Sequence, residues 1–498
     1  MKKKDGKQSR SGKFTLNSQN EVYGELKIDG EASSLYLHDK EYFTPAIPDR
    51  CIKGVLHDLT KVTLIDCVAP PVPGSYSRGE EGYHFAEIFP HYVVQGDRHI
   101  DPNEEIIHEV SFLVDDAATL FSDFDAFGSV LDARPFIDEI VKAHVPNRRV
   151  ETGEDARLIY FTGKTNISTV ETVYGKVSVD RQPGFDFGGA RGAYIQNKVV
   201  ITIRFHTGLA FREAVSRASV LIDYLGMLVG RPQNLIALGL RIGIETDSPA
   251  ALDVDWSWAP KRDKSIESSQ PNSFDVLVDA VRAPTEFANV LKNWLERQEA
   301  WHGARWRFFR SFEKQRHYDP DRLIGAANMF DILPSSAVPS DIALTEELSR
   351  AQIASRAMFR DLPQSPERDS VLGALGRLGK SSLKHKVRYR AQKLFDVATE
   401  WDPEFFKVTD AAVNCRNYYV HGTEPQFDYD RNFDLVTFFT DTLEFVFAAS
   451  DLVEAGWDLK SWMTQGTTMS HPFGRYRVNY RIGLKRLAEA LSNAKAPA

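Results

Sequence analysis

Cysteine is scarce in this sequence: Cys51, Cys67 and Cys415 are the only three in 498 residues. They are too few and too widely spaced for a disulfide framework or a C-x-x-C metal site. Sparse cysteine is typical of a reducing compartment, so we expect a cytoplasmic protein. Walker, G-x-S-x-G and H-E-x-x-H patterns are also missing, which removes the commonest phosphate-binding, hydrolase and zinc-protease signals. We expect no cofactor and no metal site.

Long apolar runs are missing too, since no stretch approaches the ~20 residues that a membrane-spanning helix needs. The basic start, MKKKDGKQSRSGKF, has no apolar segment of the kind found in signal peptides. We interpret residues 1–13 as a disordered basic tail and expect no contact with a membrane.

The chain has no excess of positive charge. Its 61 Lys and Arg oppose 69 Asp and Glu, which gives a net charge of −8. A chain with a net negative charge does not attract nucleic acid over its whole surface, so any contact with RNA must come from a local basic surface.

What is present is a chain of 42% hydrophobic residues with two different periodicities. Residues 14–259 alternate apolar and polar residues in short segments, which predicts a β-rich domain of the sandwich or barrel type. Residues 260–274 are polar with Pro260 and Pro271, a composition typical of a linker. Residues 275–498 have helical spacing and many helix-start residues, which predicts a helix bundle. The predicted class is α+β multidomain.

The stretch NCRNYYVHG, residues 414–422, places Arg416 five positions before His421. This spacing is weak by itself, because RQEAWH repeats it at Arg297 and His302. Five residues of a continuous helix rotate by ~140°, so such a pair shares one site only where the helix ends just before the histidine. Gly422 and a nearby proline predict such an end after RNYYVH, whereas RQEAWH lies within a long amphipathic stretch.

Each residue of this stretch also has an ordinary structural interpretation. Arg416 can pair with a carboxylate, His421 can interact with the helix dipole, Asn417 can cap, and Tyr418 and Tyr419 can pack in the core or at its rim. Spacing alone does not separate these roles from catalysis.

The pattern Arg416, Asn417, three variable residues and His421, after the segment EFFKVTDAAVNC, resembles the signature of HEPN ribonucleases. The whole chain, with its β-rich first half, is most similar to the ApeA-like proteins, which are bacterial anti-phage abortive-infection proteins. The resemblance implies that residues 14–259 sense a phage protein trigger and that residues 275–498 are an all-α HEPN effector domain.

The resemblance also implies a chemistry, metal-independent endoribonuclease cleavage that leaves 2′,3′-cyclic phosphate and 5′-hydroxyl ends. In it, His421 transfers a proton, Arg416 holds the phosphorane oxygens and Asn417 orients its neighbours. A homodimer through the HEPN domain is the implied active form. Many HEPN domains add an acidic or hydroxyl residue from another helix, and the sequence does not identify one here.

An RNA substrate, tRNA or mRNA with single-stranded loops, requires a basic surface. The region between Asp369 and Asp396 is basic with no acidic residue. From it we predict RNA contacts by Arg377, Lys380, Lys384, Lys386, Arg388 and Arg390, joined by Tyr418 and Tyr419 beside the motif. The alternative is that LKHKVRYRAQKLF is an amphipathic helix with a solvated face.

Two other hypotheses remain open. The helical half can be a non-catalytic module that binds RNA or a nucleotide through Arg416 and His421. The β-rich half can instead bind a carbohydrate or peptide on Trp256 and Trp258 of the segment DWSWA, with the helices as a dimerisation platform.

Overall fold

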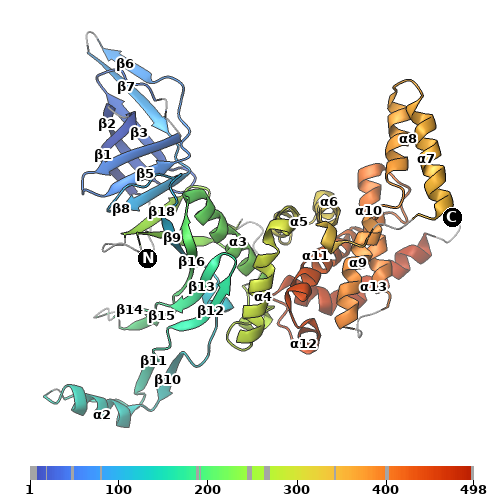
Figure 1. Ribbon diagram of the computed structural model, residues 1–498. Coiled ribbons are helices and arrows are strands. Elements are labelled where there is room, and N and C mark those ends of the chain that lie inside the picture. The colour runs from blue at the N-terminus through green and yellow to red at the C-terminus, as the bar shows by residue number, and fades with distance from the viewer. Residues whose placement is uncertain are drawn as a thin grey trace. The chain divides into compact units, whose positions relative to one another are not determined.

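The computed structural model describes residues 8–17, 20–45, 47, 50–78, 81–147, 149–186, 190, 192–243, 250–262, 270–340, 344–398 and 403–494. These residues form two compact units, with the boundary after Leu295. Unit 1 is built on a large β-sheet and unit 2 consists of helices (Figure 1). The predicted α+β class, with a β-rich first part and a helical second part, is confirmed. No helix within the described ranges is long and apolar enough to cross a membrane.

The main sheet of unit 1 has 14 strands, all antiparallel, in the order β12-β13-β16-β9-β17-β18-β8-β5-β4-β1-β2-β3-β7-β6. Two short pairs, β10–β11 and β14–β15, are separate from it. The strands are β1 (Gln8–Asn17), β2 (Asn20–Ile28), β3 (Ser34–Asp39), β4 (Cys51–Leu56), β5 (Lys61–Ile65), β6 (Gly74–Arg78), β7 (Glu81–Ile88), β8 (Tyr92–Gly96), β9 (Ile107–Val114), β10 (Phe127–Leu131), β11 (Arg157–Phe161), β12 (Asn166–Thr172), β13 (Gly175–Arg181), β14 (Gly184–Asp186), β15 (Tyr194–Gln196), β16 (Val199–Leu209), β17 (Leu235–Ile242) and β18 (Ala250–Trp256).

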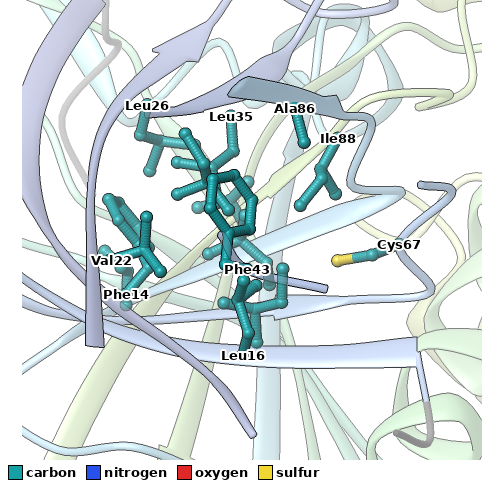
Figure 2. Close-up of a cluster of buried hydrophobic side chains, with 14 of the residues drawn as sticks. Phe14, Leu16, Val22, Leu26, Leu35, Phe43, Cys67, Ala86 and Ile88 are labelled. Atoms are coloured by element: carbon teal, nitrogen blue, oxygen red, sulfur yellow. The ribbon is translucent and has the colours of Figure 1, made fainter. Parts of the chain in front are cut away.

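One end of this sheet curls around a hydrophobic core (Figure 2). Phe14 of β1, Ile88 of β7 and Val93 of β8 all belong to this core. Because five strands separate β7 from β8 in the sheet order, the sheet must bend back on itself for these side chains to meet. The sandwich-like packing therefore comes from one curved sheet.

Helices cover the other end of the sheet. The helix α3 packs on β9 and β16 and is buried around most of its circumference, so it needs a partner on its other side as well. The helix α4 supplies it, with the Trp294 and Tyr224 rings 4.9 Å apart between centroids. The helices of unit 1 are α1 (Ala117–Leu120), α2 (Arg134–His144), α3 (Phe211–Val229) and α4 (Pro284–Glu296).

Two boundaries differ from the sequence prediction. β1 begins at Gln8 and pairs with β2, so the prediction of a disordered tail is wrong for residues 8–13, while residues 1–7 lie outside the described part. The boundary between the compact units follows Leu295, beyond the predicted linker at 260–274, because α4 packs on unit 1. Residues 263–269 of that linker are not described.

Unit 2 is organised around α11, most of whose residues are buried. Arginines from neighbouring helices neutralise its buried carboxylates: Arg305 Nε lies 2.8 Å from Asp451 Oδ2, and Arg322 Nε lies 2.9 Å from Glu444 Oε1. Removing one partner of a buried pair is strongly destabilising, so these pairs fix α5 and α6 against α11. The remaining helices are α5 (Gln298–Phe312), α6 (Pro320–Asp331), α7 (Glu346–Arg360), α8 (Pro366–Gly376), α9 (Leu383–Val397), α10 (Phe405–His421), α11 (Phe433–Ala455), α12 (Leu459–Thr464) and α13 (Pro472–Asn493).

Candidate active site

The helix α10 carries the Arg-Asn-x-x-x-His stretch and ends with it. Its buried residues hold the helix against α9 and α11. Gly422 has a φ of 63°, a left-handed conformation that glycine adopts readily, and its N–H donates to the Tyr418 carbonyl. His421 is therefore the last helical residue, and it is exposed.

Arg416 and His421 meet at this helix end. Arg416 Nη1 lies 3.2 Å from His421 Nε2 and 3.1 Å from Asn417 Oδ1. An arginine N–H can only donate, so a hydrogen bond at this contact requires Nε2 to accept and the ring proton to sit on Nδ1. The helix runs through His421, although we expected it to end just before. The long arginine side chain bridges the ~140° between the two positions.

The last turn of α6 completes the cluster. Arg416 Nη2 donates to Asn328 Oδ1 at 2.9 Å and lies 3.9 Å from Asp331 Oδ2. The start of α6 is fixed by Asp319, whose side chain accepts from the Arg322 N–H. Sequence reasoning missed Asn328 and Asp331, because no local pattern marks them and 88 residues separate Asn328 from Arg416.

The cluster combines a mostly buried cation with an exposed base. The Arg416 side chain is 12% exposed and that of Asp331 41%, while His421 is open to solvent. Within the described part of the chain, the buried Arg416 Nε has no hydrogen-bond partner. Such an arrangement can hold an anionic oxygen on the guanidinium and move a proton at the imidazole.

The two tyrosines of the motif pack against the loop that follows α10. The rings of Tyr418 and Tyr419 lie 5.2 and 6.2 Å from that of the buried Tyr429. Burial raises the pKa of Tyr419 to about 12, and its hydroxyl is buried with no partner among the described residues. The Tyr419 hydroxyl therefore cannot reach RNA in this conformation, whereas the half-buried Tyr418 stays a predicted contact.

One predicted RNA contact is wrong. Arg390 is fully buried, its Nε donates to Ser450 Oγ at 2.9 Å, and its Nη1 lies 2.9 Å from Glu454 Oε2. Its guanidinium also lies over the Trp301 ring, 4.9 Å from the centroid. Arg390 therefore anchors α9 to α11 and is not available to a ligand.

The other basic residues of this region stay accessible. Arg377 and Lys380 are exposed, and Arg388 and Lys384 share the carboxylate of Asp410. Lys386 contacts the end of α6, since its Nζ lies 3.0 Å from the Asp331 carbonyl oxygen and 3.5 Å from Asp331 Oδ1. The same carboxylate thus lies beside both Lys386 and Arg416.

The second Arg-x4-His stretch has a structural role at its arginine. Arg297 occupies the N-cap position of α5, and its Nη2 lies 2.8 Å from Asp451 Oδ1. In the segment DWSWA, Trp256 ends β18, and its Nε1 donates to His91 Nε2 at 3.0 Å, while Trp258 is 61% exposed.

No group of three or more His, Cys, Asp and Glu residues suited to a metal ion occurs in the described ranges. One hollow of unit 2 lies between α11 and α13, and another lies on α9. Neither is lined by Arg416 or His421. The exposed His421 places the end of the motif at the surface.

Comparison with protein families identifies both parts of the chain. Residues 9–294 match the family model ApeA N-terminal domain 1, and residues 324–461 match the model Apea-like HEPN. Neither a curated protein nor a solved structure matches the chain. The first match ends at the last turn of α4, close to the boundary of unit 1. The second contains the C-terminal part of α6 and all of α9, α10 and α11, with the whole Arg416 cluster. Since the first match alone spans more than half of the sequence, the chain belongs to the ApeA-like HEPN family.

Proposed function

We propose that this protein is a metal-independent endoribonuclease and the toxic effector of an anti-phage abortive-infection system. The observation that carries the proposal is the 3.2 Å contact between Arg416 Nη1 and His421 Nε2 on the exposed end of α10. It puts a fixed cation and a proton acceptor at one point of the surface, the two groups that transesterification of RNA needs.

RNA supplies its own nucleophile, the 2′-hydroxyl beside each phosphodiester. His421 Nε2 takes the hydroxyl proton, and the 2′-oxygen bonds to the adjacent phosphorus. Arg416 donates to the non-bridging oxygens while negative charge accumulates on them. The bond from phosphorus to the 5′-oxygen of the next nucleotide then breaks, and that oxygen takes a proton from water. The hydroxide that remains takes the proton back from His421. The products are a 2′,3′-cyclic phosphate and a 5′-hydroxyl.

The contact between Arg416 and His421 has to open before this reaction. In the unliganded chain Nε2 is occupied by the guanidinium N–H. A substrate phosphate offers Arg416 a charged acceptor, which binds an arginine more strongly than a neutral imidazole does. Substrate binding therefore releases His421 as a base, while Asn417 and Asn328 keep the guanidinium in place.

The open position of the motif supports a homodimer with RNA between its copies. An exposed helix end gives little of the enclosure that phosphoryl transfer benefits from. Pairing two HEPN units about a two-fold axis would place two such ends in one cleft. Lys384, Lys386, Arg388, Arg377 and Lys380 would then supply contacts to the phosphates of tRNA or mRNA loops.

A sensing role for unit 1 is supported by its arm, which we define as residues 127–161 with β10, α2 and β11. None of the 11 residues of α2 is buried, and Phe136 and Ile140 are 51% and 46% exposed on one helix face. Leu131 of β10 and Ile159 of β11 are also exposed. Exposed apolar side chains gathered on one element are typical of protein-binding surfaces, and a phage protein is the partner we assign to this one.

Purified protein incubated with total RNA in EDTA tests the proposal. We expect cleavage with cyclic-phosphate ends by the wild type, and at least ~10²-fold slower cleavage by Arg416→Ala and by His421→Ala. His302→Ala is the matched control, because it removes the histidine of the second Arg-x4-His stretch, and it should cleave like the wild type.

Cleavage by His421→Ala at the wild-type rate would overturn the catalytic role. RNA binding without cleavage by triggered wild type would favour the non-catalytic module instead. Loss of function on changing Trp258, with Arg416→Ala silent, would favour a ligand-binding protein that acts through unit 1.

A further inference from the structure

A hollow of about 550 Å³ lies on the face of α9 and has no role in the chemistry described above. Its volume is in the range typical of small-molecule sites. Of the residues that line it, Tyr389 and Phe406 supply aromatic rings, and the others supply cationic, polar or small side chains: Pro339, Ser340, Ser381, His385, Arg388 and Gln392. No carboxylate occurs among its described lining residues.

The lining combines the contacts that a nucleotide needs. Tyr389 and Phe406 are each half-buried, so each ring has a face or edge open to the hollow. Nucleobases stack on such rings whatever their sequence, and polar groups at the ring edge then select among the bases. His385 and Gln392 are exposed side chains able to make those edge contacts.

Arg388 supplies a cation held in place. Its Nε donates to Asp410 Oδ1 at 2.7 Å, and its Nη2 binds the other oxygen of that carboxylate. A guanidinium has five N–H donors, so Nη1 can still donate to a phosphate. Because two bonds orient the group in advance, less rotamer entropy is lost when it binds an anion.

The hollow lies close to the Arg416 cluster along α9. His385 directly precedes Lys386, which contacts Asp331, and Asp331 in turn lies 3.9 Å from Arg416. The lining residues from His385 to Gln392 span ~10 Å of helix at 1.5 Å per residue. The α9 and α10 helices pack side by side, so a short single strand can reach both places (Figure 1).

We propose that this hollow binds one nucleotide of the RNA substrate, with its base against Tyr389 and Phe406 and its phosphate on Arg388, and so selects the cut site. The proposal rests on the proposed ribonuclease function. It assigns to the hollow a specificity that Arg416 and His421 cannot supply, because their chemistry acts on any phosphodiester.

The first test maps cut positions in one RNA for the wild type and for Tyr389→Ala and Tyr389→Phe. Loss of the ring should redistribute the cuts and raise KM for a short oligonucleotide about tenfold or more, with kcat changed much less. Tyr389→Phe keeps the stacking surface and should match the wild type. Trp306→Ala is the control, since Trp306 is an exposed aromatic residue of the same unit outside the hollow.

The second test measures binding without cleavage. The full-length His421→Ala chain is titrated with each of the four ribonucleoside 5′-monophosphates, with and without Tyr389→Ala. We expect one base to bind more tightly than the others and that preference to disappear without the ring. A circular dichroism melting curve unchanged by Tyr389→Ala would show that the chain is still folded.

These two measurements separate the failures. If nucleotides bind selectively but the wild-type protein does not cleave RNA, the nucleotide site would be supported and the ribonuclease function would be wrong. Cleavage with the same cut positions in wild type and Tyr389→Ala would overturn the proposal. It would also be overturned if the hollow bound free monophosphates while cut positions and KM did not change, because its ligand would then be a free nucleotide.

Discussion

The polar contacts of the Arg416 side chain with the described residues are made through the two terminal nitrogens of its guanidinium. Nη1 is shared by His421 and Asn417, and Nη2 by Asn328 and Asp331. Two of these partners come from α10 itself and follow Arg416 in the sequence. The other two come from the end of α6, so the position of the cation depends on how two helices pack.

Asn328 is a positioning residue, and its replacement should affect rate more than binding. In Asn328→Leu, Arg416 Nη2 loses the acceptor that lies 2.9 Å away, and the guanidinium can shift. A displacement of ~1 Å can cost up to ~10²-fold in rate, so we expect kcat to fall about 10- to 100-fold with KM nearly unchanged. Single-turnover cleavage of an oligonucleotide measures both.

Asn328→Asp keeps an acceptor oxygen at the same place and should restore most of the activity. Melting temperatures of the two variants serve as the control for folding. A Leu variant with wild-type kcat would mean that the other partners of Arg416 position it without Asn328.

The residue types of one short sequence segment were enough to predict the motif, but not the residues of other helices that contact it. Arg416, Asn417 and His421 stand within six positions, and Gly422 marks the helix end, so local rules apply. Asn328 and Asp331 could not be found in this way, because their role arises from the packing of α6 against α10. Such contacts between distant segments leave no local sequence pattern.

At the scale of elements, the sequence pattern of α9 could have predicted which of its basic residues is buried. Its buried residues Val387, Arg390, Ala391 and Leu394 follow the i, i+3, i+4, i+7 spacing of a helix face. Arg390 stands on that stripe, whereas Arg388, one position after Val387, lies outside it. Position on the stripe therefore separates the arginine that binds α11 from the basic residues that face outward. The prediction of Arg390 as an RNA contact used charge alone.

The contact of α11 with the segment before α6 includes a titratable group. Asp441 accepts a hydrogen bond from Tyr318 Oη at 2.6 Å. Burial, together with the nearby Glu444 carboxylate, raises the pKa of Asp441 to about 6. An unfolded chain loses this proton near ~3.9. Between these two pKa values the folded protein binds more protons than the unfolded one, so this group lowers stability as pH rises from ~4 to 6.

Asp441→Asn removes that titration while keeping an oxygen for Tyr318. Relative to wild type, the variant should gain up to ~3 kcal/mol in free energy of unfolding between pH 4 and pH 7, with the full gain present above pH 6. Urea unfolding followed by tryptophan fluorescence at several pH values measures the difference. A difference that is the same from pH 4 to pH 7 would mean that folding does not raise the pKa of Asp441.

At the scale of the whole molecule, the unit boundary was harder to predict than the units. Period two and period 3.6 separate the sheet from the bundle, because each pattern reflects which side chains are buried locally. The helix α4 has the second period but packs on α3, through Trp294 and Tyr224. Helical spacing predicts that one face of a helix is buried, but it does not predict which unit that face packs against. The curved closure of the sheet is likewise a product of long-range pairing.

The arm of unit 1 offers a way to test whether that unit controls the effector. Its two ends are adjacent, because the Thr162 N–H donates to the Ala126 carbonyl oxygen at 3.0 Å. Residues 127–161 can therefore be replaced by two glycines without stretching the sheet. Cells that express this deletion should lose protection against a phage that the wild type restricts, down to the level of His421→Ala. Plaque counts measure the effect, and the melting temperature checks the fold.

A double substitution tests whether the apolar face of α2, and not the arm as a whole, is needed for protection. Phe136→Asp with Ile140→Asp places two charges on the exposed face of α2, where a partner would have to desolvate them. This pair should abolish protection as the deletion does. Lys142→Asp lies on the other side of α2 and should protect like the wild type, since it leaves Phe136 and Ile140 in place. Full protection by both the deletion and the double variant would move the trigger to another surface, while the ribonuclease site would remain a separate question.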